Sequence, residues 1–383
     1  MQISSKLPNV GTTIFTVMSK MATDHGAINL SQGFPDFEVN PSLIGLINHY
    51  MEQGFNQYAP MPGVPELRQA IASMIETTRN VEINSEDEIT VTSGATEAIY
   101  DIITATIKVG DEVILFDPAY DCYEPSILLS GGVPVHIKLK QPDFSIDWEE
   151  VASKITERTR LIMINTPHNP SGAVLSRNDL LQLQELTNGT NILVLSDEVY
   201  EHIIFDKHDH QSVLRFTELK KRSAAVYSFG KTFHATGWKM GYIIAPDWWT
   251  IEIRKVHQFV TFSTNTPIQY ALADFIKDSH NYQSVPSFYQ NKRDSFIDLI
   301  QESAFEPVNC FGTYFQLLSY KNVDALSKLG DMEAAEKLTK EYGLASIPIS
   351  VFYGDSQDDK ILRFCFAKEL DTLEKAAQIL CKI

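Results

Sequence analysis

From about residue 88 onward, short apolar runs alternate with segments that have helical spacing. The first run, EITVTSG, is rich in β-branched residues, and the segment after it places Ala98, Ile99, Ile102 and Ile103 on one side of a helix. Further short apolar runs follow: DEVILFDP, GVPVHIKL, RLIMINTP, NILVLSDE, AAVYSFG and MGYIIAP. Buried strands that alternate with helices predict an α/β fold with a mainly parallel sheet covered on both faces.

The pattern changes in the last part of the chain, from about residue 276. Helix-like segments there surround two short strands, GTYFQLL and LRFCFA, which predicts a smaller α+β domain. A chain of 383 residues exceeds the usual size of one hydrophobic core, so two domains are expected. We predict a large domain over residues 44–275 and a small, discontinuous domain formed by residues 1–43 and 276–383.

The charge balance limits the kinds of partner. Lys and Arg number 32 against 49 Asp and Glu, for a net charge of −17, and no long basic run is present, which argues against nucleic acid. No apolar run approaches the length of a membrane span, and the first residues do not resemble a signal peptide. The four cysteines are widely spaced and form no CxxC pair. We therefore expect a soluble, cytoplasmic enzyme.

Polar clusters stand at the ends of four predicted strands: SGAT, TPHNPSG, SDEVY and SFGK. In sheets of this kind, ligands bind at the carboxyl ends of the strands. The last cluster is the most informative, because Ser228 and Lys239 are suited to hold a phosphate dianion while Lys231 is free to form an imine with an aldehyde. Pyridoxal phosphate carries both groups and acts as an electron sink. The simpler interpretation of these residues alone is a strand end followed by a basic turn.

The other clusters fit the same ligand, although each also has a structural interpretation. Asp197 can keep a pyridine nitrogen protonated, or serve as a helix N-cap or in a buried ion pair. Tyr200 can bond the ring's phenolic oxygen or fill a core position. Asn169 lies in a proline-rich turn that fixes its amide, and such turns are also common for structural reasons. The free N–H groups of the Gly94-Ala95-Thr96 turn suit a phosphate.

A short stretch, EHIIFDKHDH, contains three histidines, His202, His208 and His210. It also carries aspartates, and we predict a solvated loop. No HExxH motif or Cys/His spacing supports a metal site there, so no metal is expected.

Six segments together reveal a family resemblance: SGATEA, PAYDCYEP, NTPHNPSG, SDEVYEH, SFGKTFHATGWKMGY and RFCFAK. In order and spacing they resemble the class I aminotransferases of the fold-type I pyridoxal-phosphate enzymes. The resemblance runs from about Asn29 to Lys368, nearly the whole chain. It is strongest for the branch that holds glutamine transaminase K, kynurenine aminotransferases and bacterial methionine aminotransferases.

The resemblance implies a role for each candidate residue. Lys231 binds pyridoxal 5'-phosphate covalently and then moves the proton of the substrate's Cα. Asp197 pairs with the pyridine nitrogen, and Tyr200 and Asn169 hold the ring oxygen. The remaining implied cofactor contacts are stacking by Tyr120 and phosphate binding by Ser228, Lys239, Gly94, Ala95, Thr96 and, across a homodimer interface, Tyr58. Position 239 is usually arginine in the wider class, and lysine keeps the charge but loses the planar fork.

For the substrate, the resemblance implies that Arg363 clamps the carboxylate, assisted by Asn169 and the backbone around Gly33. The region around Phe262 offers no arginine for an acidic side chain, which would be buried at high cost. The implied side-chain pocket is instead aromatic, with Phe15, Tyr58, Tyr120, Phe262 and Tyr314.

We predict ping-pong transamination between a 2-oxo acid and methionine, glutamine or an aromatic amino acid. The alternative is a C–S β-lyase on the same fold. Such enzymes typically have a tryptophan soon after the NPxG motif, whereas Ala173 follows it here.

Overall fold

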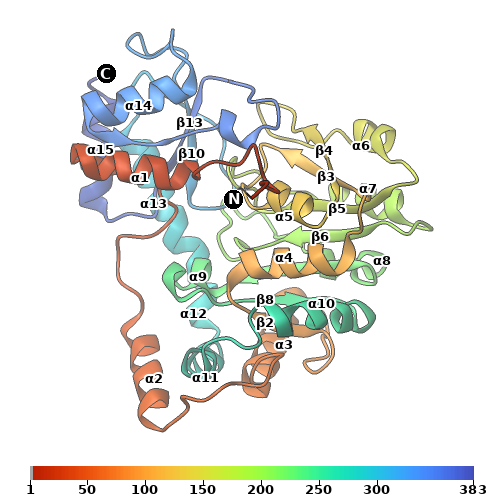
Figure 1. Ribbon diagram of the computed structural model, residues 1–383. Coiled ribbons are helices and arrows are strands. Elements are labelled where there is room, and N and C mark those ends of the chain that lie inside the picture. The colour runs from red at the N-terminus through yellow and green to blue at the C-terminus, as the bar shows by residue number, and fades with distance from the viewer. Residues whose placement is uncertain (1–2) are drawn as a thin grey trace.

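A seven-stranded sheet forms the centre of the structure, a computed structural model that describes residues 3–383 (Figure 1). The order across the sheet is β2-β8-β7-β6-β5-β3-β4. The strands are β2 (Ile89–Thr92), β3 (Glu112–Asp117), β4 (Val133–Lys138), β5 (Thr159–Asn165), β6 (Leu193–Asp197), β7 (Ser223–Ser228) and β8 (Gly241–Ile244). β8 runs antiparallel to both of its neighbours, and the other pairs are parallel. The predicted mainly parallel sheet is thereby confirmed.

Helices cover both faces of this sheet, which is why its central strands are continuous apolar runs (Figure 1). α4 (Gly94–Thr106) packs on β7 and β8 and buries the predicted stripe of Ala98, Ile99, Ile102 and Ile103. The other helices that follow strands of the sheet are α5 (Tyr123–Leu129), α6 (Trp148–Lys154), α7 (Arg177–Thr187), α8 (Thr217–Lys220), α9 (Phe229–Thr232) and α10 (Asp247–Val260). α10 packs against α4.

The C-terminal part forms a second, smaller α+β unit, as predicted. Its antiparallel sheet has the order β12-β13-β10-β9, with β9 (Glu306–Pro307), β10 (Phe315–Ser319), β12 (Ile347–Pro348) and β13 (Ile361–Cys365). Its helices are α13 (Val285–Leu299), α14 (Asp331–Tyr342) and α15 (Leu370–Leu380). The N-terminal segment joins this unit, because α1 (Ile14–His25) packs against α14 and β1 (Ile28–Asn29) pairs with β11 (Leu344–Ala345).

Three further helices connect the two units along the chain. α2 (Pro41–Glu52) lies beside α11 (Thr266–Phe275), which also packs on α3 (Pro65–Arg79) (Figure 1). The predicted domain limit at residue 43 therefore falls inside α2, and the limit at residue 275 falls at the end of α11. The exact division stays a prediction. Among residues 3–383, no helix is long and apolar enough to cross a membrane.

The solvated loop predicted for the histidine-rich stretch is wrong at two of its three histidines. His208 is exposed, but the side chains of His202 and His210 are 9% exposed. The buried position of His210 is explained by Glu198, which directly follows β6 and is fully buried, because a buried carboxylate is stable only with partners for its charge. His210 Nε2 is 2.9 Å from Glu198 Oε2, and the Tyr227 hydroxyl donates to the same oxygen at 2.9 Å.

Candidate active site

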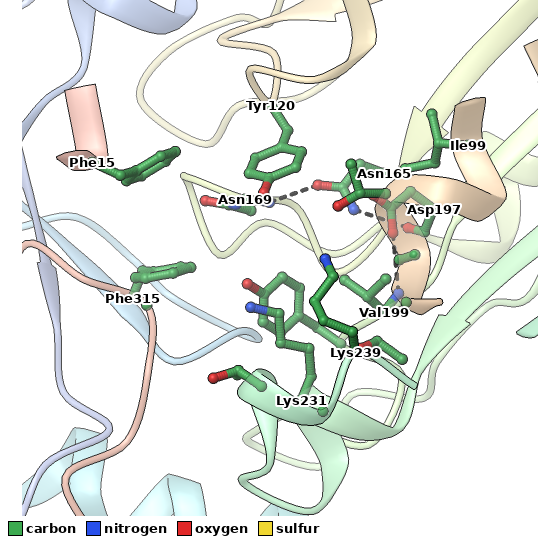
Figure 2. Close-up of a pocket in the computed structure, with 18 of the residues that line it drawn as sticks. Phe15, Ile99, Tyr120, Asn165, Asn169, Asp197, Val199, Lys231, Lys239 and Phe315 are labelled. Carbon is green, nitrogen blue, oxygen red and sulfur yellow. Dashed lines mark hydrogen bonds between the residues drawn. The ribbon is translucent and has the colours of Figure 1, made fainter. Parts of the chain in front are cut away.

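A cavity of about 250 Å³ opens at the carboxyl ends of the parallel strands, and Figure 2 shows residues that line it. Every predicted cofactor-binding and carboxylate-binding residue except Tyr58 lines this cavity: Phe15, Gly33, Gly94, Ala95, Thr96, Tyr120, Asn169, Asp197, Tyr200, Ser228, Lys231, Lys239 and Arg363. Tyr58 instead lies on the surface, with 84% of it exposed. The fold thus brings together residues that are up to 348 positions apart, from Phe15 to Arg363.

Strand pairing explains why these groups meet. Asn165, the last residue of β5, pairs with Asp197, the last residue of β6. Ser228, the last residue of β7, pairs with Gly241, which also pairs with Thr92 at the end of β2. Because β8 is antiparallel, its first residue lies at the same edge as the last residues of its neighbours. The segment before β8, which carries Lys239, therefore reaches the cavity.

Lys231 lies on the short helix α9, directly after β7. Its Nζ donates a hydrogen bond to the Tyr314 hydroxyl at 2.8 Å, and that hydroxyl donates to the Gly33 carbonyl at 2.6 Å. Burial lowers the pKa of Lys231 to about 8, and the positive charge of Arg363 acts in the same direction. A larger fraction of this amine is therefore neutral, and nucleophilic, near neutral pH than for an exposed lysine.

Asp197 is held at the opposite side of the cavity by several hydrogen bonds (Figure 2). The Tyr123 hydroxyl donates to Oδ2 at 2.6 Å, and the Val199 N–H donates to Oδ1 at 3.2 Å. Asn165 Nδ2 donates to the Asp197 carbonyl at 2.9 Å. Burial raises the pKa of Asp197 to about 6, although the Tyr123 and Val199 hydrogen bonds oppose that shift. A positively charged N–H donor next to this buried carboxylate would stabilise its ionised form.

One end of the cavity has the chemistry of an anion site. Gly94 begins α4 with a φ of +75°, and a Cβ there would lie 3.3 Å from Lys239 Cε and 3.4 Å from its Nζ. A Cβ at Gly241 would lie 2.9 Å from the Gly94 carbonyl carbon, so β8 approaches the turn closely only because it begins with glycine. Lys239 itself has a φ of +53°. The lysine amine, the free N–H groups of the turn and Ser228 thus line one end of the cavity.

Arg363 is 1% exposed, and its described hydrogen-bond partners are neutral oxygens. Nη1 donates to Asn169 Oδ1 at 2.9 Å and Nη2 donates to the Ser31 carbonyl at 3.2 Å. The guanidinium lies 3.8 Å from the centre of the Phe315 ring. Its buried Nε has no hydrogen-bond partner among residues 3–383. Because a buried cation with a free donor is costly, this site is suited to a carboxylate ligand.

The five residues predicted to form the aromatic pocket do not all lie together. Phe15 and Tyr120 line the cavity with ring centres 6.4 Å apart. Tyr314 is buried and serves as the hydrogen-bond partner of Lys231. Tyr58 and Phe262 contact each other edge to face at 5.5 Å, and both are exposed on this chain.

Sequence reasoning missed several residues that shape this site. Tyr123 and Asn165 fall within the segments PAYDCYEP and NTPHNPSG, so the sequence marked them as close to the site. Their hydrogen bonds to Asp197 were not predictable, because Asp197 lies in another segment. Phe315, which lies beneath Arg363, had no signal beyond its apolar strand. An amine with a lowered pKa, a buried acid and an anion site in one cavity fit pyridoxal 5'-phosphate.

Comparison with known proteins defines the class of protein. The family model for aminotransferase class I and II matches residues 25–380. The chain belongs to this family and is an aminotransferase.

Individual relatives narrow the resemblance. The chain is 51% identical to methionine aminotransferase from Escherichia coli, over 98% of this chain and 96% of that protein. It is 34% identical to kynurenine–oxoglutarate transaminase from Dictyostelium discoideum, over 99% and 96% of the two chains. The solved structure of YbdL from Escherichia coli, identified as having a methionine aminotransferase function, superposes with a TM-score of 0.97 at 50% identity and covers both chains completely.

Proposed function

We propose that this aminotransferase uses pyridoxal 5'-phosphate to transfer the amino group of methionine, glutamine or an aromatic amino acid to a 2-oxo acid. The observation that carries the proposal is the single cavity that joins Lys231, Asp197, the anion site and Arg363. When bound, pyridoxal phosphate supplies an aldehyde for the amino group and an electron sink for the carbanion. Lys231 is the residue that would hold it covalently.

The residues of this chain divide the remaining work. Arg363 binds the carboxylate of the substrate, and Asn169, bonded to Arg363, keeps the guanidinium in place. Lys231 Nζ takes the proton from the substrate's Cα and returns a proton, which a lysine with a pKa of about 8 does near neutral pH. Asp197 is the residue that would keep a proton on the nitrogen of the bound ring, and Tyr120 is the aromatic residue that would stack on it.

One site is expected to serve both halves of the reaction. An amino acid and a 2-oxo acid carry the same carboxylate, so Arg363 binds either of them. The first product must then leave before the second substrate enters, which makes the reaction ping-pong. The Escherichia coli relative is named for methionine and the Dictyostelium relative for kynurenine, which supports an apolar or aromatic donor.

The substrate proposal predicts a clear order in a half-reaction screen. Each amino acid is mixed with the enzyme, and the loss of the bound cofactor's absorbance is followed. We expect methionine, phenylalanine and glutamine to have specificity constants at least roughly 10-fold above that of aspartate. An acidic side chain would lie among Phe15, Tyr120 and Phe315, and the cation next to these rings, Arg363, is already taken by the substrate's α-carboxylate.

Two results would contradict this prediction in different ways. A larger specificity constant for aspartate would overturn the aromatic pocket. Release of pyruvate and ammonia from a cysteine S-conjugate, as fast as transamination, would favour the β-lyase alternative instead.

We also propose a homodimer, in which Tyr58 reaches the phosphate site of the partner subunit. Exposed aromatic residues support it, because Tyr58 and Phe259 are 84% and 86% exposed and Phe262 lies against Tyr58. We expect sedimentation to give twice the 43.2 kDa of the chain, and Tyr58→Phe to weaken cofactor binding without changing that mass. A monomer with full activity would rule this out.

The proposed cytoplasmic location is supported by the four free cysteines.

A further inference from the structure

A buried cluster of Glu97, Asp101 and His257 lies behind the turn that begins α4, outside the residues that line the cavity. Glu97 and Asp101 lie on the first two turns of α4, and His257 lies on α10, which packs against it. Side chains of these types are able to bind a metal ion. Their contacts indicate a different role.

Both ring nitrogens of His257 face oxygen atoms. Nδ1 lies 2.7 Å from Glu97 Oε1 and 3.5 Å from Asp101 Oδ2, and Nε2 lies 3.0 Å from the Met61 carbonyl. A carbonyl only accepts, as does an ionised carboxylate, so both nitrogens donate and the ring is a cation. Burial lowers the pKa of His257, but the hydrogen bonds to Asp101 and Glu97 outweigh it and raise that pKa to about 9. Hydrogen bonds to Glu97 and to the Met61 carbonyl thus account for both ring nitrogens.

The hydrogen bond from His257 Nδ1 to Glu97 connects the cluster to the anion site. The second oxygen of Glu97 accepts a hydrogen bond from the Ser93 N–H, at the start of the Gly94-Ala95-Thr96 turn. Glu97 therefore fixes the backbone whose N–H groups face the cavity. An unpaired Glu97 carboxylate this close would also repel a bound phosphate, and the positive charge of His257 offsets part of the negative charge of Glu97 and Asp101.

The hydrogen bond from His257 Nε2 to the Met61 carbonyl connects the cluster to the segment that carries Tyr58. Met61 lies three residues after Tyr58, and the next carbonyl, of Pro62, accepts from the Val91 N–H at 2.9 Å. His257 thus bonds the segment next to Tyr58 on one side and, through Glu97, the Ser93 turn on the other.

We propose that His257 is a positioning residue for the phosphate site, which holds the Ser93–Thr96 turn through Glu97 and the Tyr58 segment through Met61. The proposal rests on the proposed use of a phosphorylated cofactor. We expect His257 to affect binding of the phosphate group and not binding of the pyridine ring. Asp197 and Lys231, which would hold the ring, make their hydrogen bonds outside this cluster.

The test compares two ligands of the apoenzyme that differ only in the phosphate. Pyridoxal phosphate and pyridoxal are each titrated by absorbance into the wild type and into His257→Gln, which removes the charge and one donor. We expect the affinity for pyridoxal phosphate to fall about 10-fold, the effect of losing one charged hydrogen bond. The affinity for pyridoxal stays within about twofold, since nothing in the cluster touches its ring. Glu97→Ala cuts the same connection to the Ser93 turn and serves if His257→Gln does not fold. We expect it to lower the affinity for pyridoxal phosphate by a smaller factor, because it also removes a negative charge near the phosphate, and to leave the affinity for pyridoxal unchanged.

Arg254 offers a matched control on the same helix. It bonds Thr90 Oγ1 at 3.1 Å and the Ile89 carbonyl at 2.7 Å, and so attaches α10 to β2 instead of to the Ser93 turn. We expect Arg254→Gln to bind both ligands as the wild type does. Amide hydrogen exchange in the variant His257→Gln is expected to quicken both at residues 93–96 and at residues 57–63.

Three outcomes would overturn the inference. One is unchanged affinity for pyridoxal phosphate in both cluster variants, and another is an equal loss for both ligands, which indicates general destabilisation. The third is faster exchange in only one of the two segments. Failure of the wild-type apoenzyme to bind pyridoxal phosphate would instead refute the proposed function itself.

Discussion

Lys231→Ala is expected to abolish measurable transamination while the protein still folds and binds its cofactor without a covalent bond. The variant loses both the covalent attachment and the group that moves the Cα proton, and loss of a proton-transfer group alone costs roughly 10²–10⁴-fold in rate. Borohydride reduction of the wild type followed by peptide mapping is expected to place the pyridoxyl group on Lys231. The control is Lys221→Ala, because Lys221 is an exposed lysine paired with Glu218 at 2.6 Å.

The pH dependence of the reactivity of the Lys231 amine provides a second test of the same assignment. Burial lowers its pKa to about 8, so the protonated amine predominates below that pH and the neutral, reactive amine above it. In the apoenzyme, labelling of Lys231 by an amine-reactive probe is expected to rise with pH and level off above about 8. Exposed lysines keep rising toward about 10.4. A pyridoxyl group on Lys239, or a Lys231 profile that follows the exposed lysines, would contradict the assignment.

Asp197→Ala is expected to lower kcat roughly 10²–10³-fold in the cofactor-saturated enzyme, the size of effect seen when one preorganised polar contact is removed from a reacting centre. Without a carboxylate the ring nitrogen loses its proton and the ring becomes a poor electron sink. Stability falls much less, by roughly 1–3 kcal/mol, because the Tyr123 hydroxyl and the Val199 N–H lose their acceptor.

Two companion variants separate charge from packing in that experiment. Asp197→Asn keeps the size of the side chain and an acceptor for Tyr123 but removes the charge, so its kcat is expected to fall nearly as far. Tyr123→Phe keeps the charge and removes one hydrogen bond at 2.6 Å, so its effect is expected to be much smaller. Near-normal turnover of saturated Asp197→Ala would show that another group controls the proton on the ring.

The sequence predicted the parts of this structure that depend on local patterns. Buried strands are continuous apolar runs, and the helix that follows β2 has its apolar stripe at the predicted positions. The candidates for cofactor binding other than Tyr58 also lie beside strand ends of the large sheet, where a parallel sheet collects them, whereas Phe15, Gly33 and Arg363 come from the small unit. Their meeting in one cavity was predictable because each of these cofactor candidates belongs to one of the six recognisable segments. Their chemical roles stay predictions until the variants are measured.

What the sequence did not predict depends on contacts between distant segments. The hydrogen bond from Lys231 to Tyr314 joins residues 83 positions apart, and no local pattern indicates it. Burial of His202 and His210 was missed for the same reason. Arg79, at the end of α3, forms a buried ion pair with Glu201, which turns a polar-looking stretch into part of the interior. Tyr58 is the reverse case, because its predicted role requires a second chain.

The antiparallel direction of β8 has a consequence for how sequences of this family diverge. The connection from Ser228 to Gly241 leaves and re-enters the sheet on the side where the parallel strands end, and its two ends are paired with each other. An insertion there would shift Lys239 relative to Lys231, so deletions and insertions are expected to be rare in it. Turns on the side where the parallel strands begin, such as the one before β6, carry none of the candidate groups. Length variation among homologues is therefore expected to accumulate on that side of the molecule.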